Sequence, residues 1–143
     1  THVLNDIGIN AKGHSRLVSL NMYINGLPMQ FYEGDGLLIS TPTGSTAYNL
    51  SAGGPVLSHN SRMMVVTPVC PHSLGNRSLV LSENDSITVE FINRISSPVD
   101  AAAVTIDGNL SGTLSQGEKI PFLAYPPLSL FAWNYVPSSL YSF

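Results

Sequence analysis

The sequence predicts an all-β fold, a two-layer β-sandwich with one short helix after the loop formed by residues 41–46. Short apolar or alternating segments recur along the chain at close spacing, which is typical of antiparallel sheets. Ten prolines and twelve glycines separate these segments and exclude long helices. A length of 143 residues suffices for a full hydrophobic core, so we expect residues 1–143 to form one domain.

The clearest local signal is a β-hairpin near the N-terminus. Apolar and polar residues alternate over residues 18–24, and Asn25-Gly26 supplies the turn into residues 27–32. Further on, a half-exposed strand is predicted over residues 87–91, where Ile87, Val89 and Phe91 alternate with polar residues. The remaining expected strands are the buried-type run 37–39 and the segments 63–67, 78–81, 102–106, 119–124 and 128–133.

A loop rich in hydroxyl groups and glycine follows the run 37–39. Thr43 or Ser45 is expected to cap a short helix that continues to Leu50, and Gly53-Gly54 to end it. Unpaired backbone N–H groups at the start of such a helix suit an anionic or strongly hydrogen-bonding ligand. The same composition also fits a capped turn with no ligand.

The order of residues around this loop is more specific than its composition. The run Gly34-Asp35-Gly36-Leu37 is followed by Ser-Thr-Pro-Thr-Gly-Ser-Thr-Ala-Tyr at 40–48 and by Leu-Ser-Ala-Gly-Gly-Pro at 50–55. Further motifs agree in order and spacing: Leu4-Asn5-Asp6, Tyr23-Ile24-Asn25, Pro71-His72-Ser73-Leu74, Arg77, Leu79-Val80 and Ile106-Asp107-Gly108. Over nearly its whole length the chain resembles the C-terminal domain of the NAD kinase family.

The resemblance implies a phosphotransferase that makes NADP. Members move a phosphoryl group from ATP, or in some cases polyphosphate, onto the adenosine-ribose 2′-hydroxyl of NAD, and Mg²⁺ arrives with the ATP phosphates. Their catalytic aspartate belongs to a Gly-Gly-Asp-Gly motif in an N-terminal α/β domain, and this motif is absent from the present sequence. No catalytic residue is therefore expected in this chain, and the chain alone is expected to be inactive.

The resemblance also implies a set of NAD-binding residues. Asn5 and Asp6 match an Asn-Glu pair that binds the ribose on the nicotinamide side, although Asp6 is one methylene group shorter than glutamate. Asp35 matches a position that reaches across a subunit boundary toward NAD. Asn5 and Asp6 also fit a turn at a strand end, and Asp35 also fits a glycine-flanked β-turn.

Five further NAD contacts are implied within the loop and helix. Thr43, Thr46, Ala47 and Tyr48 match positions that line the dinucleotide, with Tyr48 beside the nicotinamide, and Ser51 matches a polar contact near that end. A tyrosine at this position suits packing as well as ring stacking. Ser51 suits an exposed helix position equally.

His72 is tempting as a catalytic residue, but we interpret it as structural or interfacial, because the family's aspartate activates the acceptor hydroxyl. Asp107-Gly108-Asn109 resembles a loop near the family's site, with Asn109 in place of the commoner glutamine. His2, His14 and His59 show no metal-ligand spacing, so no metal site made by the protein alone is expected.

The amino-acid composition limits the classes of partner that this protein is expected to bind. Charged residues make up only 10% of the chain against 43% hydrophobic residues, which predicts a covered surface and hence a homodimer or homotetramer, a missing domain, or both. A net charge of −3 with six Lys plus Arg argues against nucleic-acid binding. No apolar run approaches the roughly 20 residues of a membrane span, and no signal peptide opens the chain. The single cysteine, Cys70, fits a reducing, cytoplasmic location.

Two alternatives to an NAD kinase domain remain open at this stage. One is a non-catalytic nucleotide-binding or assembly domain that retains the fold. The other is a relative of the diacylglycerol and sphingosine kinases, which are similar to this family in fold; the run at 40–48 favours the NAD branch.

Overall fold

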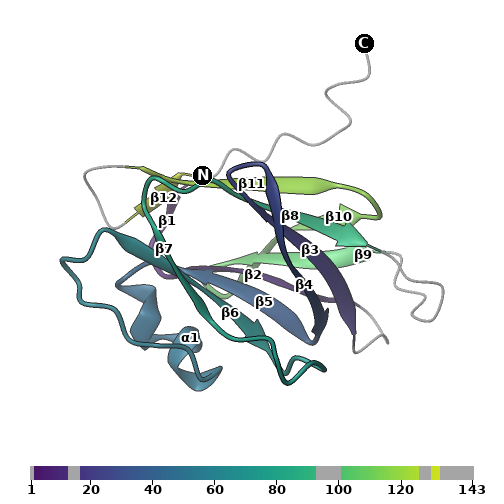
Figure 1. The fold of residues 1–143 in the computed structure, drawn as a ribbon, viewed down its shortest axis with the longest axis horizontal. Coiled ribbons are helices and arrows are strands. Elements are labelled where there is room, and N and C mark those ends of the chain that lie inside the picture. Colours follow the sequence, from purple (N-terminus) through teal and green to yellow (C-terminus); the bar gives the residue numbers. More distant parts are fainter. Residues whose placement is uncertain (1, 13–16, 93–100, 126–129, 133–143) are drawn as a thin grey trace, which may run out of the picture.

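The computed structural model describes residues 2–12, 17–92, 101–125 and 130–132. In this part of the chain, twelve strands form two antiparallel six-stranded sheets that stack face to face (Figure 1). The first sheet has the strand order β1 (His2–Val3), β12 (Leu130–Ala132), β11 (Lys119–Tyr125), β8 (Ile87–Ile92), β3 (Val18–Ile24) and β4 (Leu27–Gly34). The second sheet has the order β10 (Asn109–Ser115), β9 (Ala101–Ile106), β2 (Asp6–Ala11), β5 (Gly36–Ser40), β6 (Met63–Val69) and β7 (Leu79–Ser82). The predicted two-layer β-sandwich is confirmed.

The hydrophobic core lies between the sheets and is formed by inward-facing apolar residues of both, among the side chains that the structure describes. Ile7, Leu37 and Ile39 enter it from the second sheet, and Phe91 and Phe122 from the first. Each of these five side chains is at most 1% exposed. Burial of such side chains is the main favourable term in folding and fixes how the two sheets are placed against each other.

The predicted hairpin is confirmed in detail. Asn25 and Gly26 both have positive φ angles, +52° and +80°, as a two-residue type I′ turn requires. The turn joins β3 to β4, and the Asn25 side chain bonds to the turn between β7 and β8 through Asp85 and the backbone of Ser86.

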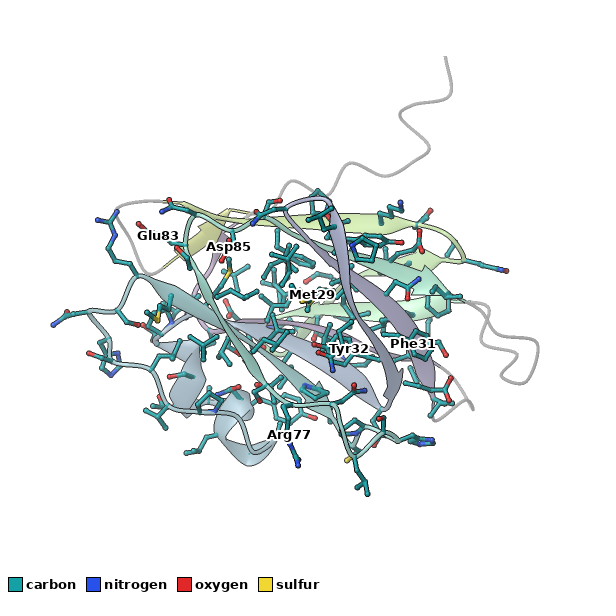
Figure 2. All side chains as sticks on the ribbon, viewed as in Figure 1. Met29, Phe31, Tyr32, Arg77, Glu83 and Asp85 are labelled. Atoms are coloured by element: carbon teal, nitrogen blue, oxygen red, sulfur yellow. The ribbon has the colours of Figure 1, made fainter. Side chains whose placement is uncertain are left out.

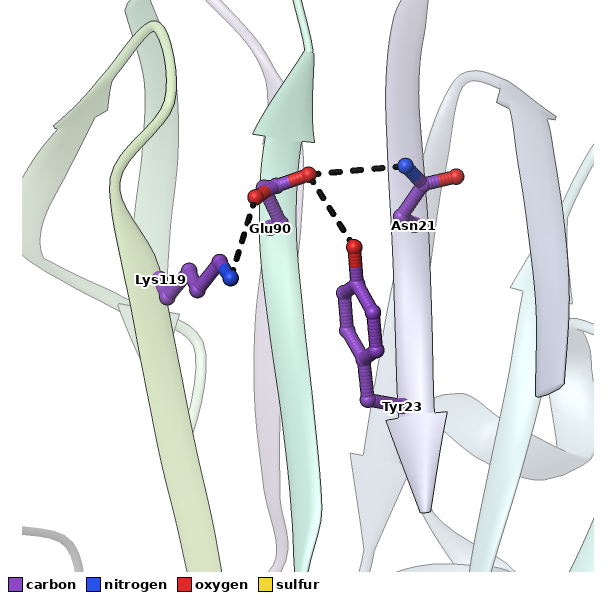
Figure 3. Close-up of polar contacts among 4 residues, drawn as sticks. All are labelled: Asn21, Tyr23, Glu90 and Lys119. Carbon is purple, nitrogen blue, oxygen red and sulfur yellow. Dashed lines mark hydrogen bonds and ion pairs between the residues drawn. The ribbon is translucent and has the colours of Figure 1, made fainter. Parts of the chain in front are cut away.

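The outer face of the first sheet is polar, as the alternation over residues 87–91 predicted. Glu90 on β8 receives hydrogen bonds from Asn21 and Tyr23 on β3, both 3.4 Å long, and pairs with Lys119 on β11 at 3.4 Å (Figure 3). The Lys119 ammonium also lies 5.1 Å from the centre of the Tyr23 ring. These cross-strand contacts give modest stability because the side chains remain partly in water.

Strand β4 forms one edge of the first sheet and is partly covered by the β6–β7 connection (Figure 2). The backbone N–H of His72 donates to the Glu33 carbonyl at 2.8 Å, and the Asn76 amide donates to the Phe31 carbonyl. On the same strand, Tyr32 is 2% exposed, and burial raises its pKa to about 12. The backbone N–H of His72 therefore helps to cover a sheet edge, whereas the role of its side chain stays a prediction.

Three strands were not predicted, and each has a recognisable cause. β1 has only two residues, and β10 contains a register irregularity between Leu110 and Gly112. β2 was missed because Gly8 and Asn10 interrupt its apolar pattern. A Cβ at Gly8 would lie 2.5 Å from the Thr105 hydroxyl on the neighbouring strand β9, so a larger residue there would force a shift. Of the segment predicted over residues 128–133, residues 130–132 form β12, and 128, 129 and 133 lie outside the described residues.

Candidate functional site

The connection from β5 to β6 begins with a segment, residues 41–57, that we call the 41–57 loop. It contains the 3₁₀ helix η1 (Gly44–Thr46) and the helix α1 (Tyr48–Ser51), and α1 lies beside the outer side of β5 and β6 (Figure 1). Because this loop covers their outer face, Leu38 and Ser40 on β5 are as buried as the core-facing Ile39 between them.

Thr41 ties the start of this loop to the segment before β2. Its hydroxyl donates to the Leu4 carbonyl at 2.6 Å and accepts the Gly44 N–H at 2.9 Å. Its own backbone N–H donates to the Asn5 carbonyl at 2.9 Å. Gly44 packs so closely against Asn5 that a Cβ on residue 44 would lie 1.8 Å from the Asn5 carbonyl oxygen. The glycine of this motif is thus required by a backbone contact.

Ser45 and Asn49 form a buried polar network under the loop. The Ser45 hydroxyl donates to the Pro42 carbonyl at 2.7 Å and accepts the Leu57 N–H at 2.9 Å. The Asn49 amide donates to the carbonyls of Ser45 and Pro55, both at 2.9 Å, and its oxygen accepts a 2.6 Å bond from Thr67 on β6. These side chains hold the loop against the sheet.

The helix at this loop differs from the expected one at its start. Neither Thr43 nor Ser45 makes a side-chain cap, and α1 has only four residues with Ala47 as its N-cap. The N–H groups of Gly44, Ser45 and Ala47 are already bonded within the protein, so these three donors are not available to an anion. The end of the helix is as predicted, because Gly53 adopts the left-handed conformation, with φ of +83°.

A cleft of about 330 Å³ opens where this loop meets β2 and β9. It is lined by Asn5, Asp6, Asn10, Ala47, Tyr48, Thr105, Asp107 and Gly108. Four of the eight predicted NAD-binding residues, Asn5, Asp6, Ala47 and Tyr48, therefore share one cavity. Tyr48 is 48% exposed, which leaves its ring accessible to a ligand.

The other four predicted residues do not line this cleft. Thr43 and Thr46 lie on the same loop, where the Thr46 hydroxyl donates to the Thr43 carbonyl at 3.1 Å, and Ser51 is an exposed residue of α1. Asp35 is exposed and precedes β5, at the end of that strand remote from the 41–57 loop. There its charge and a side-chain hydrogen bond raise the pKa of the Cys70 thiol.

Two lining residues, Asn10 and Thr105, were missed from the sequence. The alternation of Ile7 and Ile9 was the available signal, because it puts Asp6, Gly8 and Asn10 on the opposite face of a strand. Thr105 pairs with Gly8 across almost a hundred residues of sequence, so no local pattern identifies it. Asp107 and Gly108 come from the motif already noted, whereas Asn109 is exposed and outside the lining set.

Asp6 is the most electrostatically perturbed group of the cleft. It is 5% exposed, and its pKa is raised above the ordinary 3.8, first by burial and then by the negative charge of Asp107. When folding raises the pKa of a carboxyl group, the folded protein is more stable with that group protonated than with it ionised. Ionised Asp6 therefore destabilises the fold at neutral pH, and this penalty disappears as the pH falls through its folded-state pKa toward 3.8.

Asp6→Asn is accordingly expected to raise the melting temperature at pH 7. The gain over the wild type should shrink as the pH is lowered, because the wild-type carboxyl then becomes neutral as well. Thermal unfolding of both proteins between pH 3.5 and 7.5 checks this. Asp85→Asn is the control with the opposite sign, because the Asp85 carboxylate accepts bonds from Ser82 and Asn25. A lower melting temperature for Asp6→Asn at pH 7 would contradict the conclusion that ionised Asp6 destabilises the fold.

Among the residues that the structure describes, no group of three or more His, Cys, Asp or Glu side chains is arranged to hold a metal ion. Within the same residues, no helix has the length and apolar character needed to cross a bilayer.

Comparison with known proteins assigns the family. Residues 4–125 match the ATP-NAD kinase C-terminal domain. An NAD kinase of Lachnoclostridium phytofermentans is 42% identical over 117 residues, which are 82% of this chain and 41% of that protein. An NAD kinase of Lachnospira eligens is 39% identical over 137 residues, covering 90% of this chain and 47% of that protein. The chain thus spans less than half the length of these relatives.

Two solved structures share the fold. Yeast NADH kinase, solved in complex with NADH, superposes with a TM-score of 0.79 at 29% identity, covering 96% of this chain and 36% of that protein. An NAD kinase from Archaeoglobus fulgidus, solved in complex with ATP, gives a TM-score of 0.74 at 23% identity and covers 90% of this chain and 47% of that protein. The match over residues 4–125, the curated relatives and the shared sandwich together show that this chain belongs to the ATP-NAD kinase C-terminal domain family.

Proposed function

We propose that this chain is the NAD-binding part of an NAD kinase, which phosphorylates the adenosine-ribose 2′-hydroxyl of NAD to give NADP. The observation that carries the proposal is the cleft, in which Asn5, Asp6, Ala47 and Tyr48 come together from two distant segments. These are four of the positions that the family resemblance assigns to NAD. The other four, Thr43, Thr46, Ser51 and Asp35, remain proposed contacts.

The chemistry of the cleft suits one end of a dinucleotide. The Asn5 amide donates and accepts hydrogen bonds, and the Asp6 carboxylate accepts them, so the pair matches the two hydroxyl groups of a ribose. Tyr48 offers an aromatic face to a planar ring. Asp6 and Asp107 make this end of the cleft negative, which disfavours a phosphate here and favours a neutral or cationic group such as oxidised nicotinamide.

The remaining parts of the reaction are assigned to sequence outside this chain. In the proposed enzyme, an aspartate of the N-terminal domain removes the proton from the acceptor hydroxyl, and ATP enters with Mg²⁺ on that side. This chain by itself is then inactive, because it lacks both proton abstraction and the positioning of the donor phosphate. The enzyme is proposed to act in the cytoplasm.

A kinase assay on the full-length protein that contains this chain tests the proposal. The protein is incubated with NAD, ATP and Mg²⁺, and NADP is measured with an NADP-specific dehydrogenase. Parallel reactions with polyphosphate as donor and with NADH as acceptor define the substrate range. NADP formation supports the proposal. Binding of NAD without NADP formation would instead favour the non-catalytic nucleotide-binding domain.

Asp35 is proposed to contact NAD bound to a neighbouring subunit of a homodimer or homotetramer. Its exposed position, away from the cleft of its own chain, is compatible with such a contact. Its backbone is held independently of its side chain, because its N–H donates to Val69 and its carbonyl accepts from Ala11. A substitution that keeps the size of the side chain should therefore preserve the turn.

Asp35→Asn is expected to raise the KM for NAD in the full-length enzyme. Loss of one charged hydrogen bond is worth about 1.5–3 kcal/mol, or roughly 10- to 150-fold in kcat/KM. Steady-state kinetics with NAD varied at saturating ATP measure the effect, and a melting curve of the same variant serves as the control. Unchanged NAD kinetics together with a lowered melting temperature would assign Asp35 a purely structural role.

A further inference from the structure

The turn between β9 and β10 reaches the Leu4–Asn5–Asp6 segment, about a hundred residues away in sequence. Three consecutive backbone N–H groups point at the Asp107 carboxylate: Asn5 at 2.6 Å and Asp6 at 3.1 Å donate to Oδ1, and Leu4 at 3.1 Å donates to Oδ2. The Asp107 backbone N–H returns a bond to the Asp6 carbonyl at 2.9 Å. Bonds to an ionised acceptor are about twice as strong as neutral ones, so this is a firm attachment.

The opposite side of the same segment is held by the 41–57 loop. The Thr41 hydroxyl and N–H bond to the carbonyls of Leu4 and Asn5, and Gly44 lies directly against the Asn5 carbonyl. The N–H groups of the segment and the Asp6 carbonyl are thus bonded to the β9–β10 turn, and the Leu4 and Asn5 carbonyls to the 41–57 loop. Such two-sided attachment leaves the backbone little freedom to rotate.

The side chains of Asn5 and Asp6, unlike their backbone, are not held by hydrogen bonds from the rest of the described protein. Asn5 and Asp6 both line the cleft, and no described residue forms a hydrogen bond with the side chain of either one. Their orientation therefore depends on the backbone that carries them. A positioned pair binds a ligand more tightly than a mobile pair, because less freedom is lost on binding.

We propose that Asp107 is a positioning residue for NAD, whose carboxylate fixes the backbone of Asn5 and Asp6 so that their side chains meet the ribose hydroxyls. This inference rests on the proposed function and extends it to a residue for which the family resemblance implied no role beyond proximity to the site. Aspartate suits the position for a second reason. Residue 107 has a φ of +49°, and aspartate and asparagine tolerate this left-handed conformation better than most residues.

Two substitutions separate the carboxylate from the turn. Asp107→Asn retains the side-chain size and the tolerance of positive φ, but replaces one acceptor oxygen by an NH₂ group. Asp107→Gly retains the backbone conformation and removes the anchor entirely. In the full-length enzyme, the KM for NAD is expected to rise about 10-fold in Asp107→Asn and further in Asp107→Gly. The KM for ATP should remain within about twofold, because the anchor does not touch the donor.

Amide hydrogen exchange supplies a measurement independent of activity. The Leu4, Asn5 and Asp6 amides should be protected in the wild type and exchange at least about 10-fold faster in Asp107→Gly. Asn25→Gly is the matched control, because Asn25 also has a positive φ, precedes a glycine and bonds a neighbouring turn, but does not line the cleft. It should lower the melting temperature and leave the KM for NAD unchanged.

Each outcome decides between distinct interpretations. Faster exchange together with a raised KM for NAD supports the positioning role. A raised KM with unchanged exchange would mean that Asp107 contacts the ligand directly, and faster exchange with an unchanged KM would mean that the anchor is only structural; either result overturns the inference. A wild-type enzyme that makes no NADP overturns the proposed function and this inference with it, whereas an active wild type with unaffected variants overturns this inference alone.

Discussion

Gly44→Ala is expected to destabilise the protein by about 3 kcal/mol or more. The added Cβ would lie 1.8 Å from the Asn5 carbonyl oxygen and 2.3 Å from the Asn5 carbonyl carbon. Both contacts involve backbone, so no side-chain rotation relieves them. Either the 41–57 loop or the segment before β2 must move, and both line the cleft.

The same movement should impair NAD binding. Protein that still folds as Gly44→Ala is expected to show a raised KM for NAD, because Asn5 and Ala47 would separate. Thermal or urea unfolding measures the stability, and NAD kinetics of the full-length enzyme measure the second effect. Gly112→Ala is the matched control, because nothing lies within 4 Å of a Cβ at that position. Equal stability of the two variants would contradict a close contact between Gly44 and the Asn5 backbone.

Asn49→Ala is expected to lower the free energy of unfolding by about 3 kcal/mol. Asn49 has 0% exposure, and its removal leaves the Ser45 and Pro55 carbonyls and the Thr67 hydroxyl without the partners they have now. Each buried polar group left unsatisfied costs about 1–3 kcal/mol, although Thr67 retains a 3.0 Å contact with Ser78. The loss should therefore approach that of a large core truncation.

Asn49→Asp tests the direction of these bonds. The aspartate oxygen that replaces the amide nitrogen would face two carbonyl oxygens, so this variant should be at least as unstable as Asn49→Ala at neutral pH. Asn84→Ala is the control, because Asn84 lies in an exposed turn and should change stability by less than about 0.5 kcal/mol. Chemical denaturation of the three variants gives the comparison. A loss below about 1 kcal/mol for Asn49→Ala would mean that water replaces its bonds.

Ser45, Thr46 and Asn49 show why the chemistry of the loop was only partly predictable. Ser45, Thr46 and Asn49 look equivalent in sequence, as polar residues near a turn. In the structure Ser45 and Asn49 are fully buried and hold the loop, whereas Thr46 is exposed. The difference arises because the loop folds over β5 and β6. Which loop residues become buried depends on those strands, and the sequence of the loop alone does not show it.

Local chemistry was sufficient where the interacting residues are neighbours. Asn25-Gly26 determined its hairpin because the two residues themselves supply the positive φ angles of the turn. Gly53 ended α1 for the same reason. The alternation of Ile87, Val89 and Phe91 determined a strand with one buried face, because side chains of a strand alternate by geometry. The ordered motifs between residues 34 and 55 identified the family without any structure.

Only the tertiary structure decided which residues share the cleft. Asp107 meets Asn5 across 102 positions, and Thr105 lies beside Gly8, because β9 pairs with β2 in the second sheet. The same sheet separates Asp35 from Tyr48, although the two residues are close in sequence. Dihedral preferences and hydrophobic periodicity act over a few residues. Strand order, which sets distances between remote segments, depends on how all twelve described strands bury their apolar faces together.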